Sequence, residues 1–449
     1  MPPKLAALFT ILLIFYLFWI DRKNNEGFSK AIWIPFVWMF FSRSRNISEW
    51  LNLGTPDLSA SATTILEGNP LNRNVYLFLI IAGIVILLKR KIDWHTLFIK
   101  NSWIWLYLAF GALSFVWSDY PYVSFKRWIK ALGVVVMVLI VVSESRPYIA
   151  IGVLLKRLAF ILLPLSVLFI KYYPELGRGY HMGQPMFTGV SDQKNGLGQI
   201  CLFAGIYFSW NLFLGRREEN VSGQKLHYSI YLIMLPMIAW LLYMANSATS
   251  LACLISAIGI FAVGSHPAMV SNPRRILQLG IASVLVFGML EFAFSIKDTI
   301  ITLLGRRPDL TTRVPMWEDL LSMVKNPIIG FGYESFWLGD RLQYMVEHWG
   351  IDSQAHNGYL EMYLNLGIVG LMFILLWTVS GLRNVNRHLT TDYPAAMLRF
   401  CFIVVVVLYN YTEATFFGTN TLWMLFFIGI LYIPGQDESS LLYSERKIA

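Results

Sequence analysis

The sequence predicts an all-α, polytopic integral membrane protein, a helical bundle of about 12–13 membrane spans. Apolar residue types make up 56% of the 449 residues and charged types only 14%, whereas soluble domains average about 25% charged residues. Aromatic residues reach 15%, which suits rings that anchor helices at membrane–water interfaces. A soluble chain of this composition could not cover its surface with polar groups.

Apolar runs near the length of a membrane-spanning helix, about 20 residues, recur along the whole chain. We expect spans at residues 5–20, 29–41, 75–89, 100–117, 128–144, 150–170, 197–214, 228–245, 250–264, 276–296, 359–382, 397–412 and 417–433. The second run is short for a full crossing. No small-residue cleavage site follows the first run, so it is expected to be an uncleaved helix and not a removed signal peptide.

Basic residues in the short loops predict the orientation of these spans, because they are enriched on the cytoplasmic side. They cluster at Arg22-Lys23, Lys89-Arg90-Lys91, Arg146 with Lys156-Arg157, Arg216-Arg217, Arg274-Arg275, Arg383 with Arg387, and Arg446-Lys447. The span order places all these clusters on one side. The opposite side then receives residues 42–74, 118–127, 171–196 and 297–357, together with the short turn 246–249.

The chain is expected to form one membrane domain in three parts. Residues 1–296 supply the N-terminal membrane helices, 297–357 a long periplasmic loop containing short helices, and 358–449 the C-terminal membrane helices and a cytoplasmic tail. A net charge of +9 could indicate nucleic acid in a soluble protein. Here the basic clusters separate apolar runs, so they favour membrane lipid and no nucleic acid.

The sequence lacks the motifs that are typical of several common kinds of site. Cys201, Cys253 and Cys401 all lie inside apolar runs, which predicts buried small hydrophobes and not disulfides or a metal site. No Asp-x-Asp pair occurs in a predicted external loop, so we expect no metal and no nucleotide-sugar site. The phosphate-binding motif GxxxxGK[ST] is also absent, which argues against ATP-driven transport.

The long loop carries the most informative pattern. Thr311 through Pro315 can start a helix, because Thr caps and Pro suits the first turn. Trp317, Leu320, Leu321 and Val324 then recur at helical spacing and predict a short amphipathic helix that ends near Asn326-Pro327. It could lie on the membrane surface or cover a cavity.

Two kinds of chemistry are open for the charged residues of this loop. Arg306, Arg307 and Arg313 could contact lipid headgroups, or could clamp a diphosphate, whose oxygens match guanidinium forks. His356 lies where the chain re-enters the membrane. It could be an interfacial anchor or a general base, because imidazole titrates near neutral pH.

The same segments resemble the O-antigen ligase/polymerase superfamily of bacterial envelope proteins. Gly305 through Trp317 is similar to its GR…RxxxW segment, Asn326 through Tyr333 to its Pro/Gly segment, and Ala355 through Leu360 to its aHNxyL motif. Weaker similarity to an exopolysaccharide-polymerase subgroup extends over 33–35, 42–51, 70–73, 117–127 and 193–198.

The resemblance implies a membrane-type glycosyltransferase in the bacterial inner (cytoplasmic) membrane, with its active site facing the periplasm. The donor would be a polyprenyl-diphosphate-linked glycan, and the acceptor a hydroxyl of another glycan or of lipid A core. No cofactor or metal is implied. We expect His356 to be catalytic and Arg313 and Arg306 or Arg307 to bind the diphosphate, with Trp317 and Asn357 as supporting residues.

The chain departs from the family at the turn 246–250, which has no charge although many members carry Arg or Lys there. Lys194, Arg178 and Lys126-Arg127 are the candidates for the second cation. Two other functions stay open at this point: a flippase or other transporter of lipid-linked glycans, and a scaffold of an envelope complex. The loop cations suit a flippase, but the spacing of Arg313, Trp317 and His356 favours a transferase.

Overall fold

The computed structural model describes residues 1–24, 29–51, 69–181, 184–215, 227–294, 313–350 and 354–433. The elements in chain order are α1 (Pro3–Asn24), η1 (Lys30–Ile32), α2 (Trp33–Arg43), α3 (Ile47–Leu51), α5 (Pro70–Lys89), α6 (Trp94–Lys100), α7 (Ser102–Leu113), η2 (Ser114–Val116), α8 (Pro121–Val142), α9 (Pro147–Tyr172), α10 (Pro174–Gly177), β1 (Arg178–His181), β2 (Gln184–Phe187), α11 (Lys194–Trp210), η3 (Asn211–Gly215), α13 (Tyr228–Ala245), α14 (Ala248–Ser265), α15 (Pro267–Ser271), α16 (Arg275–Phe294), α18 (Arg313–Ser322), α19 (Gly339–Trp349), α20 (Gly358–His388), α21 (Tyr393–Tyr409) and α22 (Thr421–Ile430).

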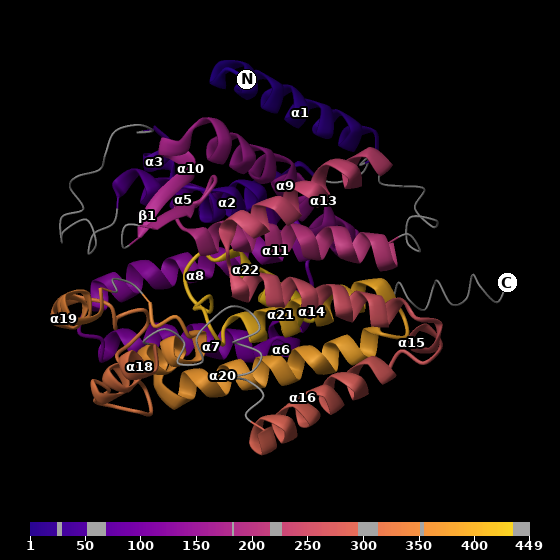
Figure 1. Ribbon diagram of the computed structural model, residues 1–449. Coiled ribbons are helices and arrows are strands. Elements are labelled where there is room, and N and C mark those ends of the chain that lie inside the picture. Colours follow the sequence, from indigo (N-terminus) through magenta and orange to yellow (C-terminus); the bar gives the residue numbers. More distant parts are fainter. Residues whose placement is uncertain are drawn as a thin grey trace.

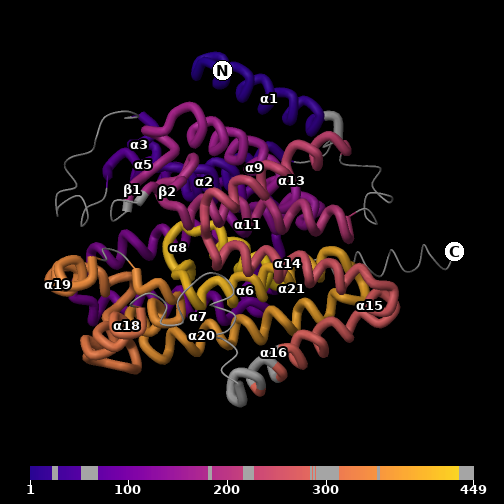
Figure 2. Tube along the Cα trace, in the orientation of Figure 1, coloured from indigo at the N-terminus to yellow at the C-terminus, as the bar shows by residue number. Residues whose placement is uncertain are grey.

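The long helices run side by side and give the bundle two ends (Figure 1). The short helices α18 and α19 and the hairpin β1–β2 lie at one end, which we call the loop end. The helix α15 lies at the other, which we call the opposite end. The tube in Figure 2 shows the same arrangement, with the C-terminal helices α20, α21 and α22 (orange to yellow) beside α7 and α14.

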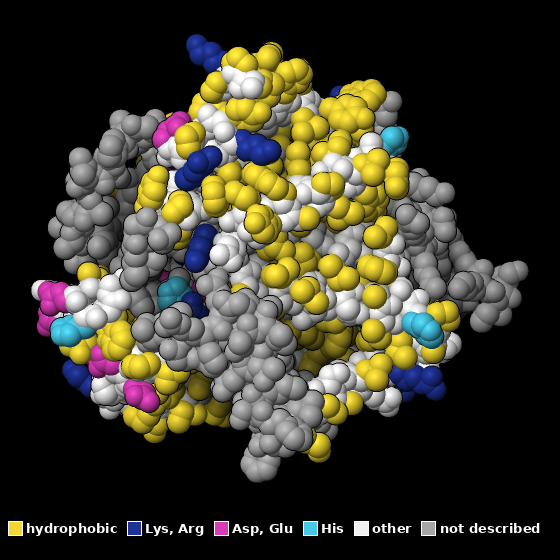
Figure 3. Space-filling model, in the orientation of Figure 1, with side chains coloured by type: hydrophobic (Ala, Val, Ile, Leu, Met, Phe, Trp, Pro, Cys, Tyr) yellow, Lys and Arg dark blue, Asp and Glu magenta, His cyan; other side chains and the backbone are white. Residues whose placement is uncertain are grey.

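The chain is a multi-pass membrane protein. Among the described residues, 7 helices are long and apolar enough to cross a membrane: α1, α5, α9, α11 continued by η3, α13, α14 and α20. Shorter apolar helices occupy 102–116, 393–409 and 421–430. Figure 3 shows a face that is mostly hydrophobic between the two ends, where most charged side chains of this face gather. Such a belt fits contact with lipid.

Every span expected from the sequence overlaps a helix, which confirms the all-α polytopic fold. Two details differ. Part of the 171–196 connection is an antiparallel hairpin in which Arg178 pairs with Phe187. The run 359–382 is interrupted, because Gly367 has φ 62° and ψ −158° inside α20.

Local caps set where many helices begin. The side chains of Asn69, Ser247, Asn357 and Asn420 accept hydrogen bonds from the first backbone N–H groups of α5, α14, α20 and α22. Helices α8, α9 and α21 have proline in the first turn, where its missing N–H costs nothing. These caps and prolines lie where the helices begin, so they fix the residue at which each helix starts.

The centre of the bundle is formed by helices with little exposed surface. All residues of α22 are buried, so this short helix is sheltered by its neighbours. Arg399 on α21 is fully buried and donates to the carbonyl oxygens of Gly429 (3.0 Å) and Leu431. It thereby satisfies the C-terminal carbonyls of α22. This pair of helices holds the connection 410–420 at the loop end.

Candidate active site

The connection 410–420 between α21 and α22 brings the candidate catalytic residues together. Its Glu413 is buried and binds side chains from three other parts of the chain. Oε2 lies 3.3 Å from Nδ1 of His356. Oε1 lies 3.4 Å from Nη2 of Arg313 and accepts a hydrogen bond of 2.9 Å from Nδ2 of Asn195. Glu413 is thus the centre of a cluster at the loop end.

The imidazole of His356 is oriented by this carboxylate. When Nδ1 donates to Glu413, the lone pair of the neutral ring is on Nε2, the arrangement a general base needs. Nε2 has no hydrogen-bond partner among the residues that the structure describes. The His356 side chain is 26% exposed, so a substrate hydroxyl can approach it.

The backbone of His356 is strained and held in place by its neighbours. Its φ is +50°, a left-handed conformation that few residues other than Gly adopt, although Asn, Asp and His adopt it more often than most, and it often marks functional sites. Trp317 of α18 donates from Nε1 to the carbonyl of Ala355 (2.8 Å). Asn357 caps α20 by accepting from Tyr359 N and Leu360 N. Both expected supporting residues therefore position the segment that carries His356.

Glu361, in the first turn of α20, holds the segment that carries His356 through hydrogen bonds. Its Oε2 accepts from Ala355 N (3.0 Å), and its Oε1 accepts from Nε1 of Trp337 (2.7 Å). Gly358 packs so closely on Asn410 that a Cβ there would lie 2.0 Å from Oδ1 of Asn410. Gly358 N donates to the carbonyls of Asn410 and Glu413. The His356 and Glu413 segments are thus joined through backbone as well as side chains.

Arg313 begins α18 and ties the long loop to the same connection. Its Nη1 donates to the carbonyl of Thr412 (2.6 Å), in addition to its contact with Glu413. The helix itself is confirmed. Its buried residues are Met316 and Leu320, whereas Leu321, which the sequence places on the apolar face, is 47% exposed. Met316 and Leu320 belong to a small separate core that also includes Phe336 and Ala355.

The remaining expected residues have different places. Lys194 is the first residue of α11, next to Asn195, so it lies beside the cluster. Arg178 lies in β1 and donates from Nε and Nη2 to the carbonyl of Ile170 (3.1 and 2.9 Å), which holds the hairpin against α9 and not at Glu413. Arg306 and Arg307 lie outside the described residues.

Glu413 and Asn195 were missed as site residues by the sequence analysis. One signal was available for Glu413, since it is the only acidic residue between Asp392 and Asp437 and lies between two apolar runs. Its pairing with His356, which is 57 residues away, depends on tertiary packing. No spacing rule predicts that contact.

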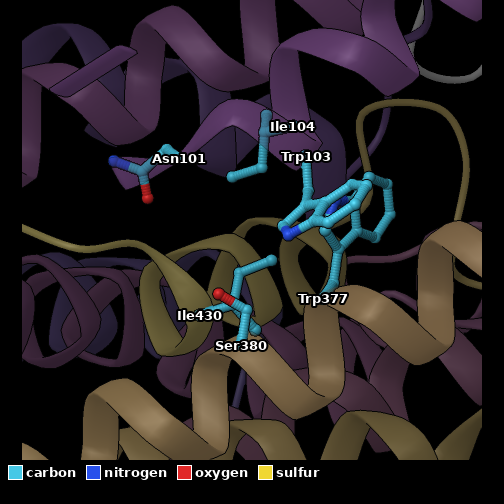
Figure 4. Close-up of a pocket in the computed structure, with 6 residues that line it drawn as sticks. All are labelled: Asn101, Trp103, Ile104, Trp377, Ser380 and Ile430. Carbon is cyan, nitrogen blue, oxygen red and sulfur yellow. The ribbon is translucent and has the colours of Figure 1, made fainter. Parts of the chain in front are cut away.

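Two further observations concern a possible metal site and a small pocket elsewhere in the bundle. Among the described residues no group of three or more His, Cys, Asp or Glu side chains is placed to hold a metal ion. A small pocket between α7, α20 and α22 is lined by Asn101, Trp103, Ile104, Trp377, Ser380 and Ile430 (Figure 4). It contains no ionisable side chain. Asn101 begins α7, so this pocket is away from the Glu413 cluster.

Comparison with known proteins found two matches, and both are described as ligases. The family model described as O-Antigen ligase matches residues 232–375. A protein of Rickettsia felis named "Putative polysaccharide ligase" is 24% identical over 165 residues, which cover 34% of this chain and 40% of that protein. No solved structure matches the chain significantly.

These matches confirm the resemblance to the O-antigen ligase/polymerase superfamily, and residues 232–375 are the part that is similar to its O-Antigen ligase family model. The matched region includes Arg313, Trp317 and His356, whereas Asn195 and Glu413 lie outside it. The superfamily supports a ligase- or polymerase-type glycan transfer in a membrane.

Proposed function

We propose that the protein transfers a polyprenyl-diphosphate-linked glycan to an acceptor hydroxyl at the periplasmic face of the bacterial inner membrane. The observation that carries this proposal is the contact of both His356 and Arg313 with Glu413. It joins a base to a cation suited to phosphate at one end of a membrane bundle. The acceptor is another glycan in a polymerase, or lipid A core in a ligase.

The proposed reaction is a single displacement. His356 Nε2 takes the proton of the acceptor hydroxyl while its oxygen attacks the anomeric carbon of the donor. The bond from that carbon to the diphosphate oxygen breaks, its electron pair leaves with the polyprenyl diphosphate, and the anomeric centre is inverted. Diphosphate is a good leaving group, so no carboxylate nucleophile is required. Arg313 stabilises the charge that develops on the phosphate oxygens.

Glu413 has two functions in this scheme. It keeps His356 in the tautomer whose Nε2 is free, and its negative charge stabilises the imidazolium that forms. It also holds Arg313 close to the same point. A donor that enters from the membrane would meet both groups together. No metal is used in the proposed step.

The test is transfer by the purified protein in lipid, with a lipid-diphosphate donor and a glycan acceptor. His356→Ala is expected to lower the rate roughly 10²–10⁴-fold while the protein stays inserted and folded. Release of polyprenyl diphosphate is the measurement. Movement of the donor across the bilayer without release would support a flippase instead, and wild-type glycan chain lengths in cells carrying His356→Ala would contradict the role of His356.

Polymerisation and ligation are distinguished by the glycans of a deletion strain. A polymerase predicts loss of long chains with single repeat units still attached to the core. A ligase predicts a bare core with lipid-linked polymer accumulating. The weaker similarity over 33–51 and 117–127 to exopolysaccharide polymerases favours the first outcome.

A further inference from the structure

Arg43, the last residue of α2, extends its guanidinium to the first turns of α11. Its Nη1 donates to Oε1 of Gln199, and its Nε donates to the carbonyl of Ser42 (2.6 Å). Its Nη2 makes no hydrogen bond to any residue in the described part of the chain. Two nitrogens therefore fix the group, and the third is available to a ligand.

The contact with Gln199 places Arg43 near the Glu413 cluster. Gln199 and Asn195 are four residues apart on α11, so they share one face of the helix. Asn195 donates to Glu413 (2.9 Å), which also binds Arg313. Arg43 and Arg313 therefore approach the same face of α11 about one helical turn apart, roughly 6 Å along the helix.

Tyr409 of α21 gives a second link between Gln199 and Glu413. Its hydroxyl accepts a hydrogen bond of 3.2 Å from Nε2 of Gln199. Its backbone carbonyl accepts a hydrogen bond of 3.1 Å from Glu413 N. The residue that holds Arg43 is thus joined to the Glu413 cluster through α21 as well as through α11.

The charges around this turn of α11 leave an excess of positive charge. Arg43, Lys194 and Arg313 lie around this turn with the carboxylates of Asp192 and Glu413, whereas Arg45 interacts most strongly with Glu49. The α13–α14 turn that packs on the same helix adds no charge: Ser247 and Ser250 face Gly198. An anion therefore suits this arrangement better than a neutral sugar.

We propose that Arg43 is the second cation of the donor site, so that Arg313 and Arg43 bind the two phosphoryl groups of a lipid-linked diphosphate across the first turn of α11. The inference rests on the proposed transferase function and assigns a residue outside the region 232–375 that the O-Antigen ligase family model matches. A guanidinium in a fixed orientation can form charge-assisted hydrogen bonds to phosphate oxygens through Nη2.

Binding of polyprenyl diphosphate and polyprenyl monophosphate to the full chain in lipid nanodiscs tests the proposal. Arg43→Gln keeps a side-chain amide that can donate to Gln199 but removes the charge. It is expected to weaken diphosphate binding roughly tenfold or more and to change monophosphate binding little. Equal losses for both lipids would indicate a general headgroup phosphate contact and would overturn the assignment, as would unchanged diphosphate binding.

Arg45→Gln is the matched control. Arg45 lies two residues away and carries the same charge, but its Nη2 donates to the carbonyl of Leu176, and its guanidinium lies 5.9 Å from the ring centroid of Phe169. Its replacement is expected to leave diphosphate binding unchanged. A loss equal to that in Arg43→Gln would mean that only overall charge matters, and the proposal would fail.

Gln199→Leu tests the orientation of Arg43 without removing any charge. It is expected to raise the KM for the donor and to leave kcat at saturating donor near the wild-type value, because Nη1 loses its partner while His356 is untouched. Arg43→Lys, which keeps the charge but not the fork, is expected to bind the diphosphate between wild type and Arg43→Gln. Unchanged donor KM in Gln199→Leu would contradict the proposal even if Arg43→Gln does not fold.

The failure of this inference is distinguishable from failure of the proposed function. If His356→Ala and Arg313→Gln abolish transfer while Arg43→Gln has a wild-type donor KM, only the inference is wrong. If the wild-type protein releases no polyprenyl diphosphate, the proposed function is wrong, and the diphosphate-over-monophosphate preference still decides the role of Arg43.

Discussion

At the scale of single residues, Glu413 connects His356, the proposed base, to Arg313, the proposed phosphate-binding arginine. A carboxylate that orients a histidine acts through it, so loss of either side chain should remove the same catalytic contribution. Glu413→Ala is expected to lower kcat roughly 10²-fold or more, and the double variant with His356→Ala should be no slower than His356→Ala alone. Steady-state transfer rates of the two single variants and the double variant provide the measurement.

Additive losses in that cycle would show that Glu413 acts independently of His356. Glu413→Gln serves as the conservative variant, because its amide oxygen can still accept from Nδ1 although its charge is lost. Its rate should lie between those of wild type and Glu413→Ala. A rate equal to wild type would mean that the negative charge is not needed.

Glu334 gives a prediction about stability and pH. It has φ +49° in the connection between α18 and α19, and its Oε1 accepts from Gly418 N (3.1 Å). Burial raises the pKa of its carboxyl above the ordinary value of 4.5, opposed by the charges of Arg127 and Lys130. The folded protein therefore holds this proton more tightly than the unfolded chain, so its contribution to stability falls as pH rises from about 4.5 through the raised pKa.

Glu334→Gln removes this dependence and keeps an acceptor for Gly418. The variant is expected to unfold at a higher temperature than wild type at pH 7 and at the same temperature near pH 4. Thermal unfolding of both proteins in detergent across this pH range is the measurement. A variant that is less stable than wild type at pH 7 would contradict the prediction.

Sequence reasoning could find His356 and Arg313 because both lie in short local motifs. It could not find Glu413, Gln199 or Arg43 as partners, because their meeting depends on how α2, α11 and the α21–α22 connection pack. The positive φ of His356 is also not predictable from sequence, since most histidines still have negative φ. The type of a residue can be read at its own position in the sequence, whereas the contacts of a buried cluster depend on how distant segments pack.

At the scale of elements, the break in α20 explains why the Pro/Gly segment of the long loop is placed where it is. Around Gly367 the helix leaves backbone groups unpaired, and the segment 327–332 pairs them. Ile368 N and Val369 N donate to the carbonyls of Pro327 and Ile328, while Phe331 N and Gly332 N donate to those of Leu364 and Asn365. This satisfies a helix break at membrane depth, where water cannot.

Gly367→Ala is expected to destabilise the protein by about 1–3 kcal/mol from backbone strain alone. Its φ of +62° disfavours a side chain, and a Cβ would lie 2.3 Å from the carbonyl carbon of Ile328. Gly259→Ala in α14 is the matched control, because a Cβ there meets nothing within 4 Å. It should be neutral or stabilising by up to about 1 kcal/mol. Thermal unfolding compares the two, and equal effects would refute the role of the break.

The spans themselves were predictable, because hydropathy over about 20 residues is a strong signal. The break at Gly367 was not, because glycine is common inside membrane helices and its φ depends on the partner segment. The hairpin β1–β2 was also not expected. Its four-residue strands are shorter than any hydropathy window, and Arg178 is fixed there by the carbonyl of Ile170.

At the scale of the whole molecule, the two ends differ in the kind of polar contact they contain. The opposite end holds ion pairs that join helices: Asp21 contacts Lys156 (2.5 Å) and Arg157 (3.0 Å), and Arg90 contacts Glu144. The loop end also has an ion pair, Arg341 with Asp119 (2.7 Å), but its Glu413 cluster in addition holds two nitrogens without a partner among the described residues, His356 Nε2 and Arg43 Nη2. The first arrangement stabilises the bundle, and the second suits binding and chemistry.

The basic clusters in the short loops predict a fixed orientation in the membrane, with the loop end in the periplasm. Glu347 in α19 and Ser271 in α15 are exposed and lie at the loop end and the opposite end. The native thiols of Cys201, Cys253 and Cys401 are buried, so a thiol reagent should label them little. In spheroplasts, a membrane-impermeant maleimide is expected to label the Glu347→Cys variant and not the Ser271→Cys variant. Lysis should make Ser271→Cys reactive, because the span expected at 276–296 would carry the chain across the membrane between the two positions. Labelling of Ser271→Cys before lysis would invert the topology and move His356 to the cytoplasmic face, where a periplasmic transfer could not occur.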